Sequence, residues 1–189
     1  MHRELEKNPE IVKQEAVKLV NDVREIPFRM GMDGNPNKLV SEGYGNCVRK
    51  HLYLAPRLQN LGYQIAGIGI ATFDWRKFNI PEEIISKLRD PIDSHTFLYL
   101  KNLEGKEILV DVTWNPEMPP GFPISSWDGE HSTAIGVTPL SITKENYDLF
   151  RNRVALFGVI RETRILVAGK KPTPFNDAFN KWIEDRKQN

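Results

Sequence analysis

The sequence has 189 residues, of which 40% are hydrophobic and 27% charged, and its 26 basic side chains nearly balance 25 acidic ones. This composition is ordinary for a globular protein and favours one domain over residues 1–189. The balanced charge argues against nucleic acid as the main partner. No apolar run approaches the roughly 18 residues of a membrane span, so we expect no membrane contact.

The cysteine and histidine content limits the other classes of protein. The charged first residues lack the apolar stretch of a signal peptide, and a single cysteine excludes an internal disulfide, so we expect a cytoplasmic protein. One cysteine cannot build a zinc cluster, and the four histidines are scattered along the chain. We therefore expect no metal and no cofactor.

The first third of the chain predicts two helices with a loop between them. Asn8 can cap a helix over residues 9–24, because asparagine accepts hydrogen bonds from a first helical turn. Residues 32–44 contain several Gly, Asn and Pro and predict a loop. An apolar segment over 46–60, stopped by Gly62, predicts a central buried helix.

The middle of the chain predicts strands. Residues 64–73 are typical of a strand, and 81–89 of a short helix. Two further strands, over 95–100 and 107–113, lie on either side of the turn sequence Asn102-Leu103-Glu104-Gly105. This arrangement predicts a β-hairpin.

The last third predicts a helix over 143–152, a strand within 155–167 and an amphipathic helix over about 175–187. The final helix would dock its apolar face through Phe175, Phe179, Trp182 and Ile183. Helices and strands that do not alternate regularly favour the α+β class.

Cys47, the single cysteine, follows the turn Gly43-Tyr44-Gly45-Asn46 and opens the central helix. The start of a helix carries about half a unit of positive charge, which favours the reactive thiolate over the thiol. The backbone N–H of Cys47 would also point toward a developing oxyanion. The competing interpretation is a free cysteine that simply packs in the core.

The hairpin supplies an imidazole and a carboxylate to accompany this thiol. His95 and Asp111 lie on the polar side of two otherwise apolar strands, if the register places them on the same face. A three-residue loop with Gly105 in the left-handed region would set Asp111 opposite Phe97 and diagonal to His95. A four-residue loop would separate the two groups. In the first register, His95 would move the thiol proton and Asp111 would orient the ring.

These three segments resemble the transglutaminase-like superfamily. Tyr44-Gly45-Asn46-Cys47 with its apolar helix is similar to that family's Cys segment, and His95-Thr96-Phe97 and Asp111-Val112-Thr113 are similar to its His and Asp strands. The resemblance covers about residues 40–116. It implies a papain-like α+β core, with the Cys helix packed on an antiparallel sheet, and a Cys47, His95 and Asp111 triad that acts on acyl groups.

The same resemblance implies a peptide, amide or small acyl substrate and leaves the acyl acceptor, water or an amine, open. Since no Gln closely precedes Cys47, Tyr44 and Asn46 are the candidate oxyanion or substrate contacts. Trp114 is a candidate wall of the acyl site or a core residue. Two alternatives stay open: acetyl transfer of the arylamine N-acetyltransferase type, and a non-catalytic binding module with the same fold.

Two other histidines have weaker interpretations. His51 lies one helical turn after Cys47. It could form a metal pair or act as an alternative base, but packing or support of the site is favoured. His131 lies in a polar segment and is expected on a surface loop.

Overall fold

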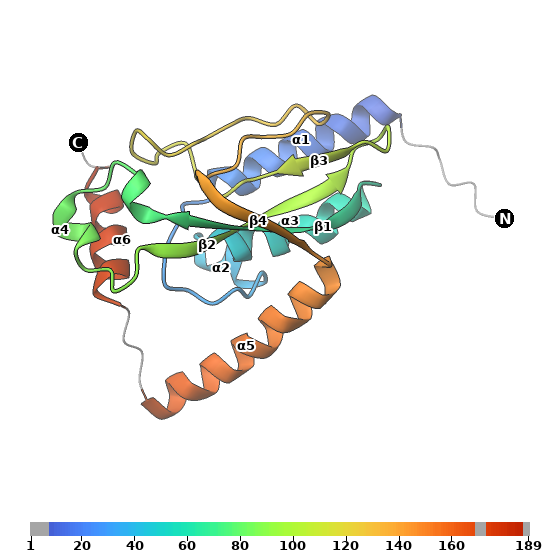
Figure 1. Ribbon diagram of the computed structural model, residues 1–189. Coiled ribbons are helices and arrows are strands. Elements are labelled where there is room, and N and C mark those ends of the chain that lie inside the picture. The colour runs from blue at the N-terminus through green and yellow to red at the C-terminus, as the bar shows by residue number, and fades with distance from the viewer. Residues whose placement is uncertain (1–7, 169–172, 187–189) are drawn as a thin grey trace.

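The computed structural model describes the backbone over residues 8–168 and 173–186, and side chains over 8–157 and 173–186. Figure 1 shows a central sheet with helices packed around it. In chain order the elements are α1 (Pro9–Glu25), α2 (Lys38–Glu42), α3 (Cys47–Asn60), β1 (Gln64–Asp74), the 3-10 turn η1 (Trp75–Lys77), α4 (Glu82–Ile85), β2 (Ile92–Lys101), β3 (Glu107–Val110), β4 (Pro139–Glu145), α5 (Tyr147–Ala168) and α6 (Pro174–Arg186).

The sheet is antiparallel throughout and has the strand order β3-β2-β1-β4. β1 and β2 form its centre, and α3 packs against both of them, with α1 packed on α3. The protein is therefore a mixed α+β fold, as the sequence predicts. Within the described residues, no helix is both long and apolar enough to cross a membrane.

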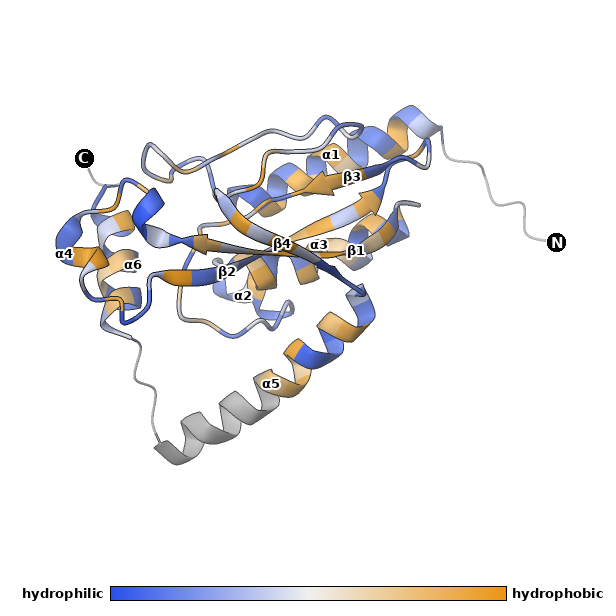
Figure 2. Cartoon of the chain, in the orientation of Figure 1, coloured by the Kyte–Doolittle hydropathy of each residue, from blue (hydrophilic) through white to orange (hydrophobic). Residues whose placement is uncertain are grey.

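The first two predicted helices are confirmed almost to the residue. Asn8 caps α1 by accepting a hydrogen bond from the Glu10 N–H at 3.0 Å. Asn46 caps α3 in the same way, through the Arg49 N–H at 2.9 Å. Figure 2 shows hydrophobic residues gathered on the strands and on parts of each helix. In α1 the buried positions are Val12, Ala16, Val20 and Val23.

Two clusters make up the core. The first is largely aliphatic and lies between α1, α3 and the sheet. The second is rich in aromatic rings and gathers residues from β1, η1, β2, α6 and the segment after β3. Its aromatic members are Phe28, Phe73, Trp75, Phe78, Phe97, Trp114, Phe122, Phe175 and Phe179. The predicted docking of the last helix is confirmed, with Phe175, Phe179 and Ile183 buried and Trp182 partly buried.

The β2–β3 hairpin has the register that the three-residue loop predicts. Tyr99 lies opposite Leu109, and the Asn102 N–H donates to the Lys106 carbonyl at 2.9 Å across the turn. Gly105 has a φ of 82°, the left-handed conformation that glycine adopts without steric cost. β3, however, ends at Val110 rather than at Thr113.

The early end of β3 has a local cause. The Asp111 N–H donates to the Thr133 hydroxyl at 2.8 Å, and the Thr113 N–H donates to the Asp111 carboxylate at 3.0 Å. These side-chain acceptors replace the backbone acceptors of a sheet ladder, so the chain leaves the sheet at Asp111.

The helix predicted over 143–152 is confirmed only from Tyr147, and the rest of the sequence-based assignment over 143–167 is wrong. Residues 139–145 form the edge strand β4, paired with β1, where a helix was expected from 143. The predicted strand within 155–167 is the second half of α5. Asn146 separates the two elements, since its side chain accepts from the Leu149 N–H at 3.1 Å at the start of α5. In Figure 1, α5 extends outward from the end of β4.

Candidate active site

Cys47 is the first residue of α3, and the turn before it is held by close packing. Gly43 ends α2 with a φ of 70° in the left-handed region. At Gly45 a Cβ atom would lie 2.5 Å from a methyl group of Leu39, which is buried. The turn therefore needs glycine at both positions, one for its conformation and one for space.

Three consecutive polar side chains after Cys47 and Val48 are buried, and each anchors a different segment to the start of α3. Arg49 donates to the Asp33 carboxylate at 2.7 Å and to the Glu42 carboxylate at 2.6 Å. Hydrogen bonds from Lys38 and Arg49 lower the pKa of Asp33 to about 2 against the opposing effect of burial. This network fastens the loop that delivers the chain to Cys47.

Lys50 is the second anchor. Its ammonium nitrogen donates to the Arg24 carbonyl at 3.1 Å and to the Thr113 carbonyl at 3.0 Å. Burial lowers the pKa of Lys50 to about 7, partly offset by the charge of Asp111. The side chain ties the end of α1, and the residues just after β3, to the helix that carries Cys47.

His51 is the third anchor and is fully buried. Its Nδ1–H donates to the Cys47 carbonyl at 2.7 Å, and its Nε2 accepts from the Val112 N–H at 3.1 Å. Because a carbonyl only accepts and a backbone N–H only donates, these partners fix a neutral ring. Burial lowers the pKa of His51 to about 4. His51 therefore supports the site and does not serve as its base.

His95 and Asp111 meet as the register requires. The His95 Nε2 atom lies 2.6 Å from the Asp111 Oδ2 atom, and both side chains are 2% exposed. The same Oδ2 atom accepts from the Gly136 N–H at 2.7 Å. The Asp111 pKa lies far below its usual range, because the charge and hydrogen bond of His95 outweigh the effect of burial. Asp111 is therefore an ionised carboxylate.

The thiol completes the constellation. Cys47 and His95 line the same cavity, and Asp111 already occupies Nε2, so Nδ1 is the ring nitrogen left for the sulfur. Burial opposes the imidazolium, but the Asp111 charge raises the pKa of His95 to about 10. Burial likewise opposes the thiolate, yet His95 and Thr96 lower the pKa of Cys47. Both shifts favour the thiolate and imidazolium form of the pair.

Cys47 and His95 open onto a cavity of about 280 Å³. Apolar side chains form much of its wall, and Asn46, Asp93, Ser94, Thr113 and Asn176 add polar groups. Trp114 lines the cavity and lies nearly parallel to the His95 ring, with 6.3 Å between the ring centres. Trp114 is also 3% exposed and packed in the aromatic cluster, which confirms its packing in the core and leaves its role at an acyl site a prediction.

The two candidate oxyanion residues lie in different places. Asn46 lines the cavity, but its Oδ1 caps α3 and its Nδ2 donates to the Met32 carbonyl at 3.3 Å. Tyr44 is not among the described residues that line the cavity, and its ring lies 4.9 Å from the Arg29 guanidinium carbon. Cys47 and Val48 occupy the first turn of α3, where backbone N–H groups have no partner within the helix.

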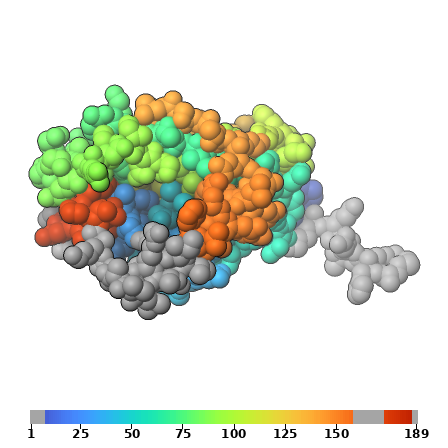
Figure 3. Space-filling model, turned by 60° about the horizontal axis from the view of Figure 1, so that its bottom comes forward, coloured from blue at the N-terminus to red at the C-terminus, as the bar shows by residue number. Residues whose placement is uncertain are grey.

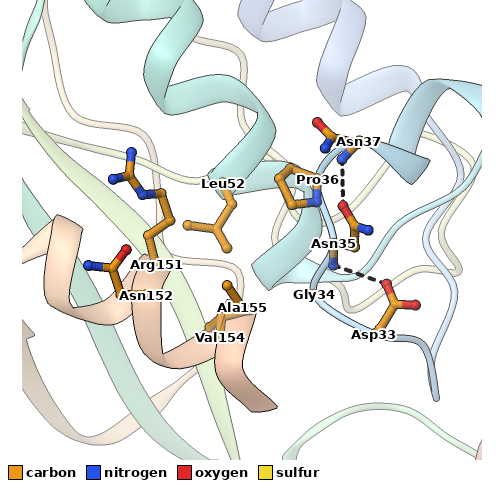
Figure 4. A pocket seen from close by; sticks show the side chains of 10 residues that line it. All are labelled: Asp33, Gly34, Asn35, Pro36, Asn37, Leu52, Arg151, Asn152, Val154 and Ala155. Carbon is orange, nitrogen blue, oxygen red and sulfur yellow. Dashed lines mark hydrogen bonds between the residues drawn. The ribbon is translucent and has the colours of Figure 1, made fainter. Parts of the chain in front are cut away.

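A second cavity, of about 390 Å³, lies near the site, but Cys47, His95 and Asp111 do not line it. Figure 4 shows Leu52 and Pro36 facing Val154 and Ala155 across it. On its other side, the Asn35 N–H donates to the Asp33 carboxylate and the Asn37 N–H to the Asn35 side-chain oxygen, both drawn as dashed lines. In Figure 3, blue residues from early in the chain lie in a recess between α6 in red and the start of α5 in orange.

Sequence reasoning missed several residues that shape the site. Gly136 approaches Asp111 so closely that a Cβ atom would lie 3.2 Å from Oδ2 and 2.8 Å from the Trp114 indole nitrogen. Thr133 is buried and holds the Asp111 backbone. Neither lies in a recognisable motif, and both come from the long segment between β3 and β4. Asp93 was available as a signal, because it precedes His95 by two residues and shares its strand face.

His131 lies in an exposed turn, as expected, where its Nδ1 is 2.7 Å from the Asp128 carboxylate. Within the described residues, no three His, Cys, Asp or Glu side chains are grouped so that they could hold a metal ion. Searches against models of protein families, curated proteins and solved structures found no match to the chain.

Proposed function

We propose that this protein is a transglutaminase-like cysteine enzyme that forms a thioester on Cys47 and passes the acyl group to water or an amine. The observation that carries the proposal is the buried hydrogen bond of 2.6 Å between His95 and Asp111, beside a thiol at the start of a helix. A cysteine that only packs in the core needs neither a neighbouring histidine with a raised pKa nor access to a cavity. Here the pKa of His95 is raised, and Cys47 lines a cavity.

The arrangement of elements supports the same proposal. The resemblance implies a thiol at the start of a helix, with the His and Asp on neighbouring antiparallel strands. Here α3 packs on β1 and β2, His95 lies on β2, and Asp111 follows β3 directly. A papain-like core is the finer assignment that we propose for this α+β fold.

In the first half-reaction, the Cys47 thiolate attacks the acyl carbon of the substrate, and the carbonyl oxygen becomes an oxyanion. The backbone N–H groups at the start of α3 donate to that oxygen. The His95 imidazolium gives its proton from Nδ1 to the leaving group as the carbon–leaving-group bond breaks, which leaves a thioester and a neutral imidazole. Asp111 holds the ring through Nε2 throughout.

In the second half-reaction, water or an amine attacks the thioester carbon and gives its proton to His95. The tetrahedral intermediate then expels the Cys47 sulfur, which restores the thiolate and imidazolium pair. The net result is hydrolysis or acyl transfer, and the acceptor that reaches the cavity sets which of the two occurs.

The test is the pH profile of Cys47 alkylation by iodoacetamide, combined with mass spectrometry after exposure to acyl p-nitrophenyl esters. We expect alkylation to be fast at about pH 6–7, and an acyl adduct on Cys47 that disappears with hydroxylamine or water. The chain has one cysteine, so a hydroxylamine-sensitive thioester can be assigned to Cys47. Reactivity only above about pH 8.5, with no acyl adduct, would indicate a non-catalytic module.

A further inference from the structure

The wall of the Cys47 cavity carries one carboxylate that the proposed chemistry does not use. Asp93 lies on β2, two residues before His95, and its side chain is exposed. Residues two apart on a strand share a face and lie about 6.6 Å apart along it. Asp93 therefore stands beside the reacting groups without touching them, within reach of a substituent on the substrate.

The Asp93 carboxylate is fixed in place by neutral donors. The Trp75 indole N–H donates to its Oδ2 at 3.1 Å, and the Ser94 N–H donates to its Oδ1 at 2.7 Å. Trp75 is 2% exposed, so this contact ties the carboxylate to a rigid part of the core. Among the described residues, no Lys, Arg or His forms an ion pair with it. A carboxylate accepts about four hydrogen bonds, so acceptor capacity remains.

The charge of the cavity follows from its lining residues. Cys47 and His95 together carry no net charge, either as thiol and imidazole or as thiolate and imidazolium, and no Lys or Arg is among the described residues that line the cavity. Asp93 then leaves the wall with a net negative charge. Around it, Phe73, Trp75 and Trp114 form an apolar and aromatic wall that suits a hydrocarbon chain.

We propose that Asp93 sets the specificity of this cavity for acyl donors that carry a positively charged ammonium group, with an alkyl chain between that group and the acyl carbon. The aromatic wall receives the chain and the Asp93 carboxylate receives the ammonium group. The same charge disfavours acyl donors that carry a carboxylate at the same position on the chain, because two negative charges would then face each other. This inference rests on the proposed thioester chemistry and names its substrate class.

The experiment compares two p-nitrophenyl esters, of Nα-acetyl-lysine and of Nα-acetyl-norleucine, which share an alkyl chain and differ in the ammonium group. The rate of the first burst of p-nitrophenolate measures acylation of Cys47. For the natural protein we expect the lysine ester to react roughly fivefold faster, the size expected of a partly exposed charge pair. This ratio should fall as salt is added.

Asp93→Asn removes the charge and keeps an oxygen that can accept from the Trp75 indole, so we expect the ratio to fall to about one. Glu83→Gln is the matched control, because it removes an exposed carboxylate of α4 outside the cavity and should keep the ratio. Equal burst rates for both esters in the natural protein would overturn the inference and leave the proposed function intact. Absence of a burst with either ester would overturn both.

Discussion

Two buried histidines approach the same carboxylate in this protein, and they differ in charge. His95, on β2, lies 2.6 Å from Asp111 through Nε2, and its pKa is raised to about 10. His51, on α3, lies 3.7 Å from the other oxygen of Asp111, and its pKa is lowered to about 4. Both side chains are almost completely buried, so burial alone does not separate them.

The partners of each ring explain the difference. The His51 Nε2 atom already accepts from the Val112 N–H, so it has no proton to share with Asp111. His95 meets an anion on both sides, the Asp111 carboxylate and the Cys47 thiolate, and each favours the imidazolium. Backbone partners thus keep one ring neutral and structural, while charged partners keep the other protonated. The site has one mobile proton, and it lies next to the thiol.

The largest expected effect follows from removing the negative charge of Asp111, which both histidine rings approach. In Asp111→Asn, the pKa of His95 falls toward its ordinary value, and the ring loses the acceptor that fixes Nε2. The pKa of Cys47 then rises, because the adjacent imidazolium is lost. We expect acylation of Cys47 at neutral pH to fall by roughly a thousandfold or more, measured as the burst rate with p-nitrophenyl esters.

Asp128→Asn is a matched control for this change. Asp128 also pairs with a histidine, His131, at 2.7 Å, but on the surface, where the two side chains are 58% and 72% exposed. Removing this carboxylate should change the burst rate by less than about twofold relative to the natural protein, since exposed ion pairs contribute little to stability. An Asp111→Asn variant that kept a tenth of the natural rate would show that His95 holds its charge without the carboxylate.

The second-largest expected effect is on the pH dependence of stability, and it reports on the protonation of His51. Its folded pKa of about 4 lies below the unfolded value of about 6.5, so the unfolded chain binds more protons between these pH values. The free energy of unfolding should therefore fall as pH falls, by roughly 2 kcal/mol between about pH 6.5 and pH 5. His95 opposes this slope only slightly, by less than about 0.5 kcal/mol, because it is protonated in the folded state and mostly protonated in the unfolded chain below about pH 6.

Urea unfolding at several pH values measures this slope, in a Cys47→Ser background that removes the titration of the thiol. The comparison is the same Cys47→Ser protein with His51→Gln added. Its free energy of unfolding should fall by roughly 2 kcal/mol less between about pH 6.5 and pH 5. Asp111, Lys50 and His95 surround His51, and they are unchanged between the two proteins. Parallel curves would show that His51 takes up its proton in the folded protein at the same pH as in the unfolded chain.

Much of this site could be predicted from the sequence because its determinants are local. The register of the β2–β3 hairpin depends on the conformation of Gly105, and a turn of that type has a short-range signature. The start of α3 depends on Asn46, which is its N-cap. Once these two features are set, Asp111 and His95 share a face.

The parts that sequence reasoning missed depend on contacts between distant segments. β4 is an exposed edge strand that pairs with β1, about 70 residues earlier, as in the pairing of Ile70 with Thr143. Its apolar alternation is short, with Leu140 and Ile142 only, and both side chains are exposed, so the strand signal is weak. Gly136 also has no local signature, since its role is the space it leaves beside Asp111 and Trp114.

The smallest effect separates the two hydrogen bonds of His51. In His51→Asn, the amide nitrogen can replace Nδ1 and donate to the Cys47 carbonyl, but the Val112 N–H loses its acceptor. In His51→Gln, the amide oxygen can replace Nε2 and accept from Val112, but the link to Cys47 is lost. Each variant loses one buried hydrogen bond, so we expect each to lose about 1–3 kcal/mol of stability.

Acylation kinetics should distinguish the two variants where stability does not. Val112 directly follows Asp111, so losing its anchor lets the carboxylate shift relative to His95, and we expect His51→Asn to lower the burst rate about tenfold. His51→Gln keeps that anchor and should lower the rate less. If both variants lost stability yet acylated Cys47 equally fast, His51 would be a packing residue with no part in holding Asp111.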